Sequence, residues 1–550
     1  MANDVEKELS EAIRRILTSQ SKKKLVVAGP GVGKTTLFRK LLDQSSGDAE
    51  QQLVLTFIHN LKTDLERSLG NAAKVFTLHG YCQHLLHRNE ELRNGLSSDF
   101  RCYPGLASLI KKDWEWLKSS NVPSFVDLMR KLSCPHEASA FYFQRANYYD
   151  AVDFDDSVYR TYQALLADKS LIPNFELVLI DEFQDFNKME ASVIDLLAEQ
   201  NPILIAGDDD QALYSQLRGA SWDHIRARYE SGQYEVFELP FCMRCPEVIV
   251  SAVNDVISKA CADKKLQNRI EKPYRYYEPV KGEDSRRYPK IELVETTVQR
   301  VNANYFGRYI IQCIEAIPEE EIRLAAEKCE PIALIIGSNP YRRQVEKCLS
   351  EADLVTGSDE EGLNEQEQAF KILNQNATSN LGWRIMLASD KESFASDLVK
   401  VAATKGISLA EIIPADYRAC VLNKAEAWAK EQEAEKVSGA NTEAAPKVLV
   451  TSFEGAKGLS SQYVFLIGLH SGEIPRDAKN VQDIEICRFL VGMTRTKKKC
   501  SVLVTRRFGD EFKSCSEFLY WINAKRFKKI EVNADYWKKR SACEVKVTAN

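Results

Sequence analysis

Short apolar runs alternate with amphipathic runs along the chain, and this alternation predicts buried strands followed by helices. The runs at 23–27, 175–180 and 202–207 are apolar and of strand length, which is typical of parallel strands buried on both faces. Residues 36–42 follow the first run and have helical spacing. The pattern therefore predicts an α/β protein.

Length and hydropathy limit the architecture. At 550 residues the chain exceeds one ordinary core, so we expect roughly two to four domains. The apolar run at 463–469 is among the longest, yet it is far too short to cross a bilayer. The N-terminal residues are polar and lack the apolar core of a signal peptide. These features favour a cytoplasmic protein with no membrane partner.

Cysteine usage and charge narrow the picture further. Fourteen scattered cysteines fit a reducing compartment, and the Cys242–Cys245 pair lacks the second ligand pair of a metal site, so we interpret it as structural or incidental. The net charge of −5 does not exclude nucleic acid, because a local basic stripe is sufficient. The basic segment 497–540 is either a solvated helix face or a contact surface.

A glycine-rich loop joins the first strand to the first helix and carries "AGPGVGKTT". Its glycines let the backbone N–H groups turn inward at a helix N-terminus, Lys34 would reach the β- and γ-phosphates, and the Thr35 hydroxyl would bind Mg²⁺. Ala28 replaces the usual first glycine of this motif, but the strand, the Lys-Thr pair and the helix all occur where it requires them. The candidate nucleotide-binding residues are Gly29, Pro30, Gly31, Val32, Gly33, Lys34, Thr35 and Thr36.

Acidic residues follow two further strands. Asp181 and Glu182 come directly after "LVLI", where Asp181 would bind the metal and Glu182 would orient or deprotonate the attacking water. Gln211 follows the strand at 202–207, and its neutral amide can sense a γ-phosphate. Adjacent surface acids are ordinarily just solvated, but their position in a chain with a phosphate loop favours catalysis.

Five motifs in order make the chain resemble one family. "AGPGVGKT", "IDEFQD", "GDDDQALY…LRGA", "FEGAKGL" and "VGMTRTK" are similar to the motif set of the UvrD/Rep-type superfamily 1 helicases. The resemblance implies two RecA-like lobes with parallel sheets, each carrying a mainly helical insertion, and ATP in the cleft between them. The limits we expect are 1–87, 173–250, 251–349 and 447–550 for the lobes, and 88–172 and 350–446 for the insertions.

The resemblance also assigns catalytic roles. It implies that Arg244 contacts the γ-phosphate and that Arg495, from the second lobe, is an arginine finger beside Glu182 and Gln211. Gly458 would allow close backbone approach at the ATP site, and Lys457 would assist there. Without the resemblance, both arginines would be interpreted as ordinary surface residues.

Two loops and one arginine are the expected contacts with single-stranded DNA. By resemblance, Phe57 would stack on a base and Arg218 would face the strand. The remaining expected contacts are Thr56, His59, Thr77 and His79. Taken as isolated residues, the two histidines are more simply interpreted as satisfied loop side chains.

The sequence departs from the family at several positions. Leu217 replaces a stacking aromatic residue, Met243 replaces a tyrosine that covers adenine, and Ser460 replaces an acidic residue. The adenine-reading glutamine is missing at its usual distance, where Ile13 lies. The second insertion is reduced to short helices and a polar stretch at 423–447 that we interpret as ending in a linker.

Taken together, these features predict an ATP- and Mg²⁺-dependent helicase or translocase on single-stranded or partly duplex DNA. Travel from 3′ to 5′ follows from family analogy alone. One alternative is a DNA-sensing ATPase subunit that unwinds little by itself, for example with a nuclease in an anti-phage system such as Gabija. Another is a P-loop protein that acts on RNA or small molecules. A role in DNA repair is a further family-level expectation.

Overall fold

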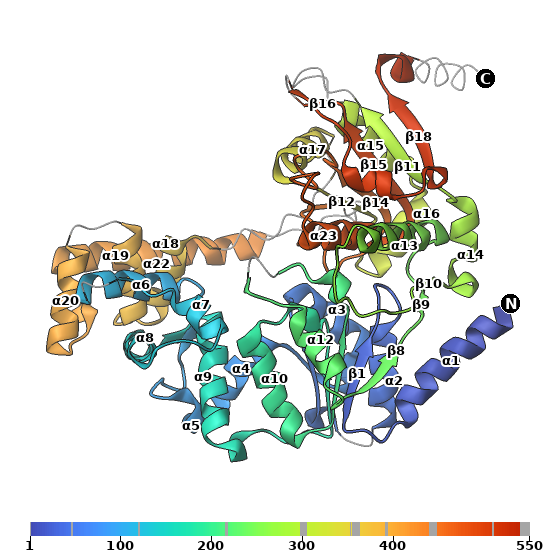
Figure 1. Cartoon of the computed structure of the whole chain (residues 1–550). Helices are drawn as coiled ribbons and strands as arrows, with labels where there is room; N and C mark the ends of the chain where they lie inside the picture. The colour runs from blue at the N-terminus through green and yellow to red at the C-terminus, as the bar shows by residue number, and fades with distance from the viewer. Residues whose placement is uncertain are drawn as a thin grey trace.

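Two α/β lobes form the body of the protein, and a helical arm extends from one side (Figure 1). The computed structural model describes residues 2–45, 48–118, 121–214, 218–296, 305–352, 354, 363–390, 394–438, 448–508 and 511–538. No helix in these ranges is both long and apolar enough to cross a membrane. The expected fold class of two parallel-sheet lobes, each with a helical insertion, is confirmed.

Lobe 1 is built on a six-stranded parallel sheet with strand order β3-β2-β6-β7-β1-β8. Its strands are β1 (Lys23–Val27), β2 (Gln52–Thr56), β3 (Lys74–Thr77), β6 (Leu177–Ile180), β7 (Ile203–Gly207) and β8 (Glu235–Glu238). Its helices are α1 (Ala2–Thr18), α2 (Lys34–Gln44), α3 (His59–Leu69), α4 (Leu78–Arg88), α10 (Lys188–Gln200) and α12 (Asp223–Glu230). The short 3₁₀ turns η4 (Phe183–Asp185) and η5 (Asp209–Gln211) follow β6 and β7. Because helices cover both faces, the central strands β6 and β7 are apolar along their whole length.

Lobe 2 repeats this plan, with strand order β13-β12-β14-β15-β11-β18 and all strands parallel. Its strands are β11 (Ile291–Thr296), β12 (Ala333–Ile336), β13 (Val448–Thr451), β14 (Ser461–Ile467), β15 (Thr496–Thr505) and β18 (Phe527–Val532). Its helices are α13 (Glu247–Ala262), α14 (Glu278–Arg287), α15 (Tyr305–Glu315), α16 (Glu319–Glu327), α17 (Asn339–Glu351), α23 (Asp483–Met493) and α24 (Glu517–Trp521). Two small ribbons pair β9 (Phe241–Cys242) with β10 (Arg275–Tyr276) and β16 (Arg507–Phe508) with β17 (Glu511–Phe512).

The arm contains helices from both insertions packed together, as Figure 1 shows. Lobe 1 contributes α5 (Glu90–Arg93), α6 (Leu106–Leu117), α7 (Phe125–Arg130), α8 (His136–Tyr149) and α9 (Phe154–Ala167), with strands β4 (Arg101–Cys102) and β5 (Ala151–Val152). Lobe 2 contributes α18 (Glu365–Gln375), α19 (Asn380–Ser389), α20 (Ala395–Lys405), α21 (Leu409–Ile412) and α22 (Ala415–Ser438). One hydrophobic core runs through both sets. The residue limits expected for the individual domains stay predictions.

Two polar segments are more regular than their composition suggests. Residues 423–438 of the polar stretch belong to the 24-residue helix α22, because its alanines, glutamates and lysines are strong helix formers, and the expected linker at its end stays a prediction. Residues 439–447 lie outside the described ranges. The lysines at 497–499 lie on strand β15 and not on a helix face, and they pair with Glu330, Glu321 and Glu292. Residues 539 and 540 of that basic segment are outside the described ranges as well.

Candidate nucleotide site and nucleic-acid face

The glycine-rich loop adopts a conformation that only glycine accommodates easily. Gly31 and Gly33 have φ values of +72° and +93°, in the left-handed region. A side chain at Gly31 would collide with Arg244, and one at Gly33 would collide with the Met243 methyl group. The loop therefore turns sharply after β1 and leaves the N-terminus of α2 open toward the space between the lobes.

Lys34 is held by the two acids expected from the sequence. Its Nζ lies 2.5 Å from Glu182 Oε1 and 3.5 Å from Asp181 Oδ1. Burial raises the pKa of Glu182, but the positive charges of Lys34 and Lys457 outweigh burial and bring that pKa well below its usual value. For Asp181, burial and the adjacent Glu182 charge prevail over Lys34, so its pKa is raised. The structure thus brings Lys34, the ionised Glu182 carboxylate and the buried Asp181 carboxylate together.

A cleft of about 990 Å³ lies over this group, and residues of both lobes line it. The P-loop, Asp181, Glu182 and Gln211 line it from lobe 1. Lys457, Gly458 and Arg495 line it from lobe 2, together with the cations Lys328 and Lys497. A cavity between two lobes with an excess of cationic side chains is suited to a polyanionic ligand.

Arg495 crosses from lobe 2 to lobe 1. Its side chain is buried, its Nη2 lies 3.1 Å from Gln211 Oε1, and its Nε donates to the Val491 carbonyl at 2.9 Å. Burial and then the neighbouring Arg244 charge lower the pKa of Arg495 to about 10. Arg244 in turn donates to the Thr494 carbonyl at 3.4 Å. Buried Arg495 beside half-buried Arg244 places two like charges at the cleft, which is costly until an anion compensates them.

Lys457 makes a second bridge between the lobes, and its role is larger than the sequence suggested. Its Nζ forms an ion pair with Asp185, contacts the Gln211 carbonyl oxygen, and lies 3.8 Å from Glu182 Oε2. The next residue, Gly458, has a φ of +86°, and a side chain there would collide with Leu61 of lobe 1. The close approach expected at Gly458 is therefore an approach of one lobe to the other.

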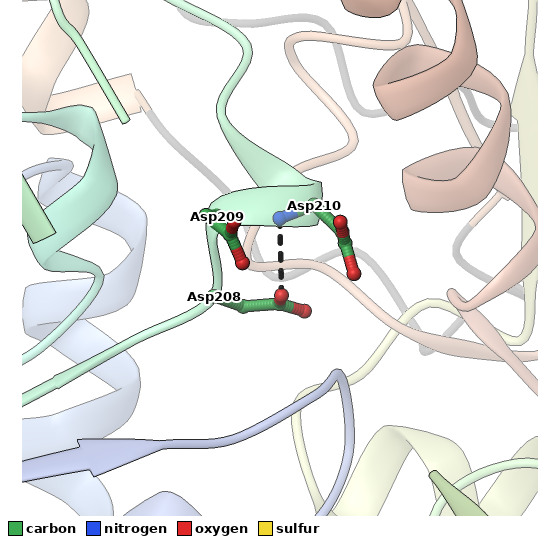
Figure 2. A group of neighbouring side chains, drawn as sticks. All are labelled: Asp208, Asp209 and Asp210. Carbon is green, nitrogen blue, oxygen red and sulfur yellow. Dashed lines mark hydrogen bonds between the residues drawn. The ribbon is translucent and has the colours of Figure 1, made fainter. Parts of the chain in front are cut away.

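An acidic cluster at the end of β7 is not a metal site in this structure. Figure 2 shows Asp208, Asp209 and Asp210 close together, with the Asp210 backbone N–H donating to the Asp208 carboxylate at 3.1 Å. Lys272 Nζ lies 2.8 Å from a carboxylate oxygen of each aspartate. Arg269 adds hydrogen bonds to Asp210 at 3.0 and 2.6 Å. These cations, together with Arg226 on Asp209, neutralise the cluster.

The CxxC pair is buried beside the same cleft. Cys242 and Cys245 are both free thiols, and the Cys242 sulfur accepts a hydrogen bond from the Cys245 backbone N–H at 3.4 Å. The Tyr274 hydroxyl, with its single proton, lies 3.2 Å from both the Cys242 sulfur and the Pro30 carbonyl oxygen. Sequence reasoning did not single out Tyr274 or Lys272, because an isolated tyrosine or lysine carries no motif.

Three of the residues expected to contact DNA, Thr56, Phe57 and His79, are buried, whereas Thr77 and Arg218 are partly exposed. Thr56 is fully buried, and Phe57 is 4% exposed, with its ring packed against Phe186 and Tyr214. The Arg218 guanidinium lies over the Phe57 ring, 4.8 Å from its centre. The expectation that Phe57 is open to stack on a base is thus not met in this conformation, because protein side chains already cover the ring.

The other expected DNA contacts have defined partners or fall outside the description. Thr77 caps helix α4 by accepting a hydrogen bond from the Gly80 N–H at 3.1 Å. His79 is 6% exposed and lies 3.1 Å from the buried Glu190 carboxylate. His59 begins helix α3, but its side chain lies outside the described structure, as does the whole of Leu217.

Comparison with known proteins agrees with this architecture. Residues 9–139 and 135–232 match the sequence model of the UvrD/REP helicase N-terminal domain. The chain is 25% identical over 398 residues to the ATP-dependent DNA helicase PcrA of Staphylococcus epidermidis, covering 64% of this chain and 50% of that protein. It is 23% identical over 410 residues to PcrA of Staphylococcus aureus, covering 66% and 55%. The chain spans about half the length of these curated relatives.

Proposed function

The chain is UvrD/Rep-like, and on that premise we propose that it hydrolyses ATP and uses the energy to move along single-stranded DNA and separate duplexes. The observation that carries the proposal is the contact between Arg495 of lobe 2 and Gln211 of lobe 1 beside the phosphate loop. An arginine from one lobe that reaches the nucleotide side of the other makes hydrolysis sensitive to lobe closure, which a translocating ATPase requires.

The proposed chemistry follows from the charges in the cleft. A triphosphate on the P-loop takes over the charge of Lys34, which frees the Glu182 carboxylate to orient and deprotonate water. Arg244 and Arg495 lie where they can stabilise the negative charge that develops on the transferred phosphoryl group. Gln211 belongs to lobe 1, which carries Glu182, and its side chain accepts a hydrogen bond from Arg495 of lobe 2. Arg495 is therefore the arginine finger in this proposal.

The residues around Asp181 fit a Mg²⁺ ion. Thr35 and Asp181 line the same cleft, and hydroxyl and carboxylate oxygens are the ligands that Mg²⁺ prefers. Burial raises the pKa of Asp181, and a nearby cation would favour its ionised form. When bound with the nucleotide, the ion would supply charge neutralisation of the β- and γ-phosphates.

Arg218 and Thr77 are the proposed first contacts with the DNA backbone, and His59, His79 and Thr56 are proposed to lie along the same path. Arg218 is partly exposed and can offer N–H donors to a phosphate. Phe57 becomes a stacking platform only when the contacts with Tyr214 and Arg218 open. By family analogy, the direction of travel is 3′ to 5′.

Nucleotide turnover by the purified chain tests the proposal. ATP hydrolysis is measured alone and with single-stranded DNA, duplex DNA or RNA, with Lys34→Ala as the inactive control. We expect stimulation that is strongest with single-stranded DNA. Duplexes with a 3′ or a 5′ tail then test unwinding and its direction. Equal turnover with and without any nucleic acid would refute a DNA-driven motor.

One observation favours a second candidate, a DNA-sensing ATPase subunit that depends on a partner protein such as a nuclease. Phe57, the expected stacking platform, is covered by Phe186 and Tyr214 in this structure. This lowers the expected affinity for single-stranded DNA until these contacts open. DNA-stimulated hydrolysis without strand separation would favour this candidate. Unwinding by the isolated chain would exclude it.

A further inference from the structure

A buried carboxylate lies behind the proposed DNA-binding face. Glu190, on the first turn of α10, has a side chain only 1% exposed. Its Oε2 accepts the Asn187 backbone N–H at 2.8 Å, while the Asn187 side chain accepts the Glu190 N–H at 3.1 Å, which forms a capping box. Its other oxygen, Oε1, is not needed for the cap and points to two side chains from elsewhere in lobe 1.

Those two side chains are candidate DNA contacts. Arg218 Nη2 donates to His79 Nε2 at 2.9 Å. Glu190 Oε1 lies 3.1 Å from His79 Nε2 and 3.7 Å from Arg218 Nη2. Burial raises the pKa of Glu190, but the adjacent His79 and Arg218 outweigh burial and lower it. The carboxylate is thus an ionised anchor, and a buried charge of this kind is tolerated only with such partners.

Arg218 is fixed by three contacts. Its guanidinium lies over the Phe57 ring, donates to His79 Nε2 and lies beside Glu190, while its side chain is still 27% exposed. A planar guanidinium held at one edge and one face presents its remaining N–H groups in a defined direction. Glu190 itself is too deeply buried to contact a phosphate and would repel one.

We propose that Glu190 is a positioning residue for DNA binding, which holds Arg218 and His79 in the orientation that meets the phosphate backbone. This inference rests on the proposed function. It also ties the DNA face to the catalytic loop, because α10 begins directly after η4, which carries Asp185, the partner of Lys457. A strand that moves Arg218 therefore acts on a helix joined to the ATP site.

Glu190→Gln tests the charge with almost no change of volume, and an amide oxygen can still accept the capping hydrogen bond. Wild type and variant are titrated with oligothymidylate at several salt concentrations while ATP turnover is recorded. We expect the DNA concentration for half-maximal stimulation to rise about tenfold, because the variant lacks the carboxylate charge that faces the Arg218 guanidinium. The slope of the log of the binding constant against the log of the salt concentration should become shallower, by the amount expected for about one phosphate contact. Maximal turnover at saturating DNA should change much less.

Glu485→Gln is the matched control. Glu485 is also a buried capping-box glutamate, on α23 of lobe 2, but its oxygens accept only the backbone N–H groups of Arg476 and Gln482. A loss of helix capping alone would therefore affect both variants, while the shift in DNA titration should occur only in Glu190→Gln. If the wild type is stimulated and Glu190→Gln matches it in half-saturation and salt dependence, the positioning role is refuted. If the wild type itself is not stimulated by DNA, the proposed function fails instead.

Discussion

Arg384 joins the two helical insertions, and replacing it should loosen the arm. The residue lies on α19 of the lobe-2 insertion and is 1% exposed. Its Nε donates to Asp113 Oδ1 of the lobe-1 insertion at 3.0 Å. The other Asp113 oxygen accepts from Arg145 Nε at 2.9 Å and from the Tyr149 hydroxyl at 2.5 Å. Asp113 is fully buried, so all of its charge is balanced by these groups.

The size of the effect follows from what remains after Arg384→Met. Methionine keeps the apolar volume but removes the charge, and Asp113 retains Arg145 and the Tyr149 hydroxyl. Loss of one partner of a buried ion pair typically costs about 3–5 kcal/mol, and because one arginine remains we expect the lower limit, about 3 kcal/mol. The stacking of the guanidinium over Trp116, at 4.8 Å, is lost as well.

Native-state hydrogen exchange measures this locally, since a multidomain chain does not unfold in one step. Amides of α6 and α19 should lose about 100-fold in protection, which corresponds to about 3 kcal/mol. Lys430→Met is the control, because Lys430 lies on α22 of the same insertion but forms only an exposed pair with Glu426. Protection in Arg384→Met equal to that in the control would show that the buried pair does not hold the arm together.

Three further predictions concern the cleft. Glu182→Gln should keep nucleotide binding while turnover falls to near zero; rapid hydrolysis in single-turnover assays would contradict its role as base. Arg495→Ala should lower maximal turnover about 10³-fold with a much smaller change in nucleotide affinity, and equal losses in both would argue against a finger. Burial raises the pKa of Asp185 to about 6, so the folded state holds this proton more tightly than the unfolded state. The contribution of Asp185 to stability therefore falls as pH rises from about 4 to about 6. Between these pH values the melting temperature of Asp185→Asn should change less with pH than that of the wild type. The same pH profile in both proteins would contradict the raised pKa of Asp185.

The strands and the phosphate loop could be predicted because local sequence determines them. Apolar runs of strand length and glycines with positive φ leave few alternatives, and Lys34, Asp181 and Glu182 meet where parallel strands end at one sheet edge. The meeting of Arg495 with Gln211 depended on family resemblance, because 284 positions separate the two residues and no local pattern links them.

What the sequence did not reveal are partners that lie far apart along the chain. Three consecutive aspartates suggest a cation site, and only the fold shows that Lys272 occupies their centre. In the same way, "TKKK" suggests a solvated basic surface until β15 places each lysine beside a glutamate. Burial of Phe57 depends on Tyr214 and Arg218, which approach it from a different segment. These contacts join residues from distant segments, so the local sequence alone does not indicate the environment of the side chain.

The lobe-2 insertion packs on the lobe-1 insertion through an apolar core. Helices α19 and α20 pack on α6 and α8 within one apolar core, and Asn380 and Tyr148 add backbone hydrogen bonds across the junction (Figure 1). Buried apolar residues of the two lobes also belong to one cluster, and the polar contacts of Lys457 and Arg495 are added to it at the cleft. Lys457 and Arg495 can exchange their present partners for phosphate oxygens at little net cost. A ligand shifts a conformational equilibrium only as far as its affinities for the two conformations differ. On the proposed function, we therefore expect a nucleotide in the cleft to act first on the contacts of Lys457 and Arg495, because these are the lobe-to-lobe contacts that phosphate oxygens can replace.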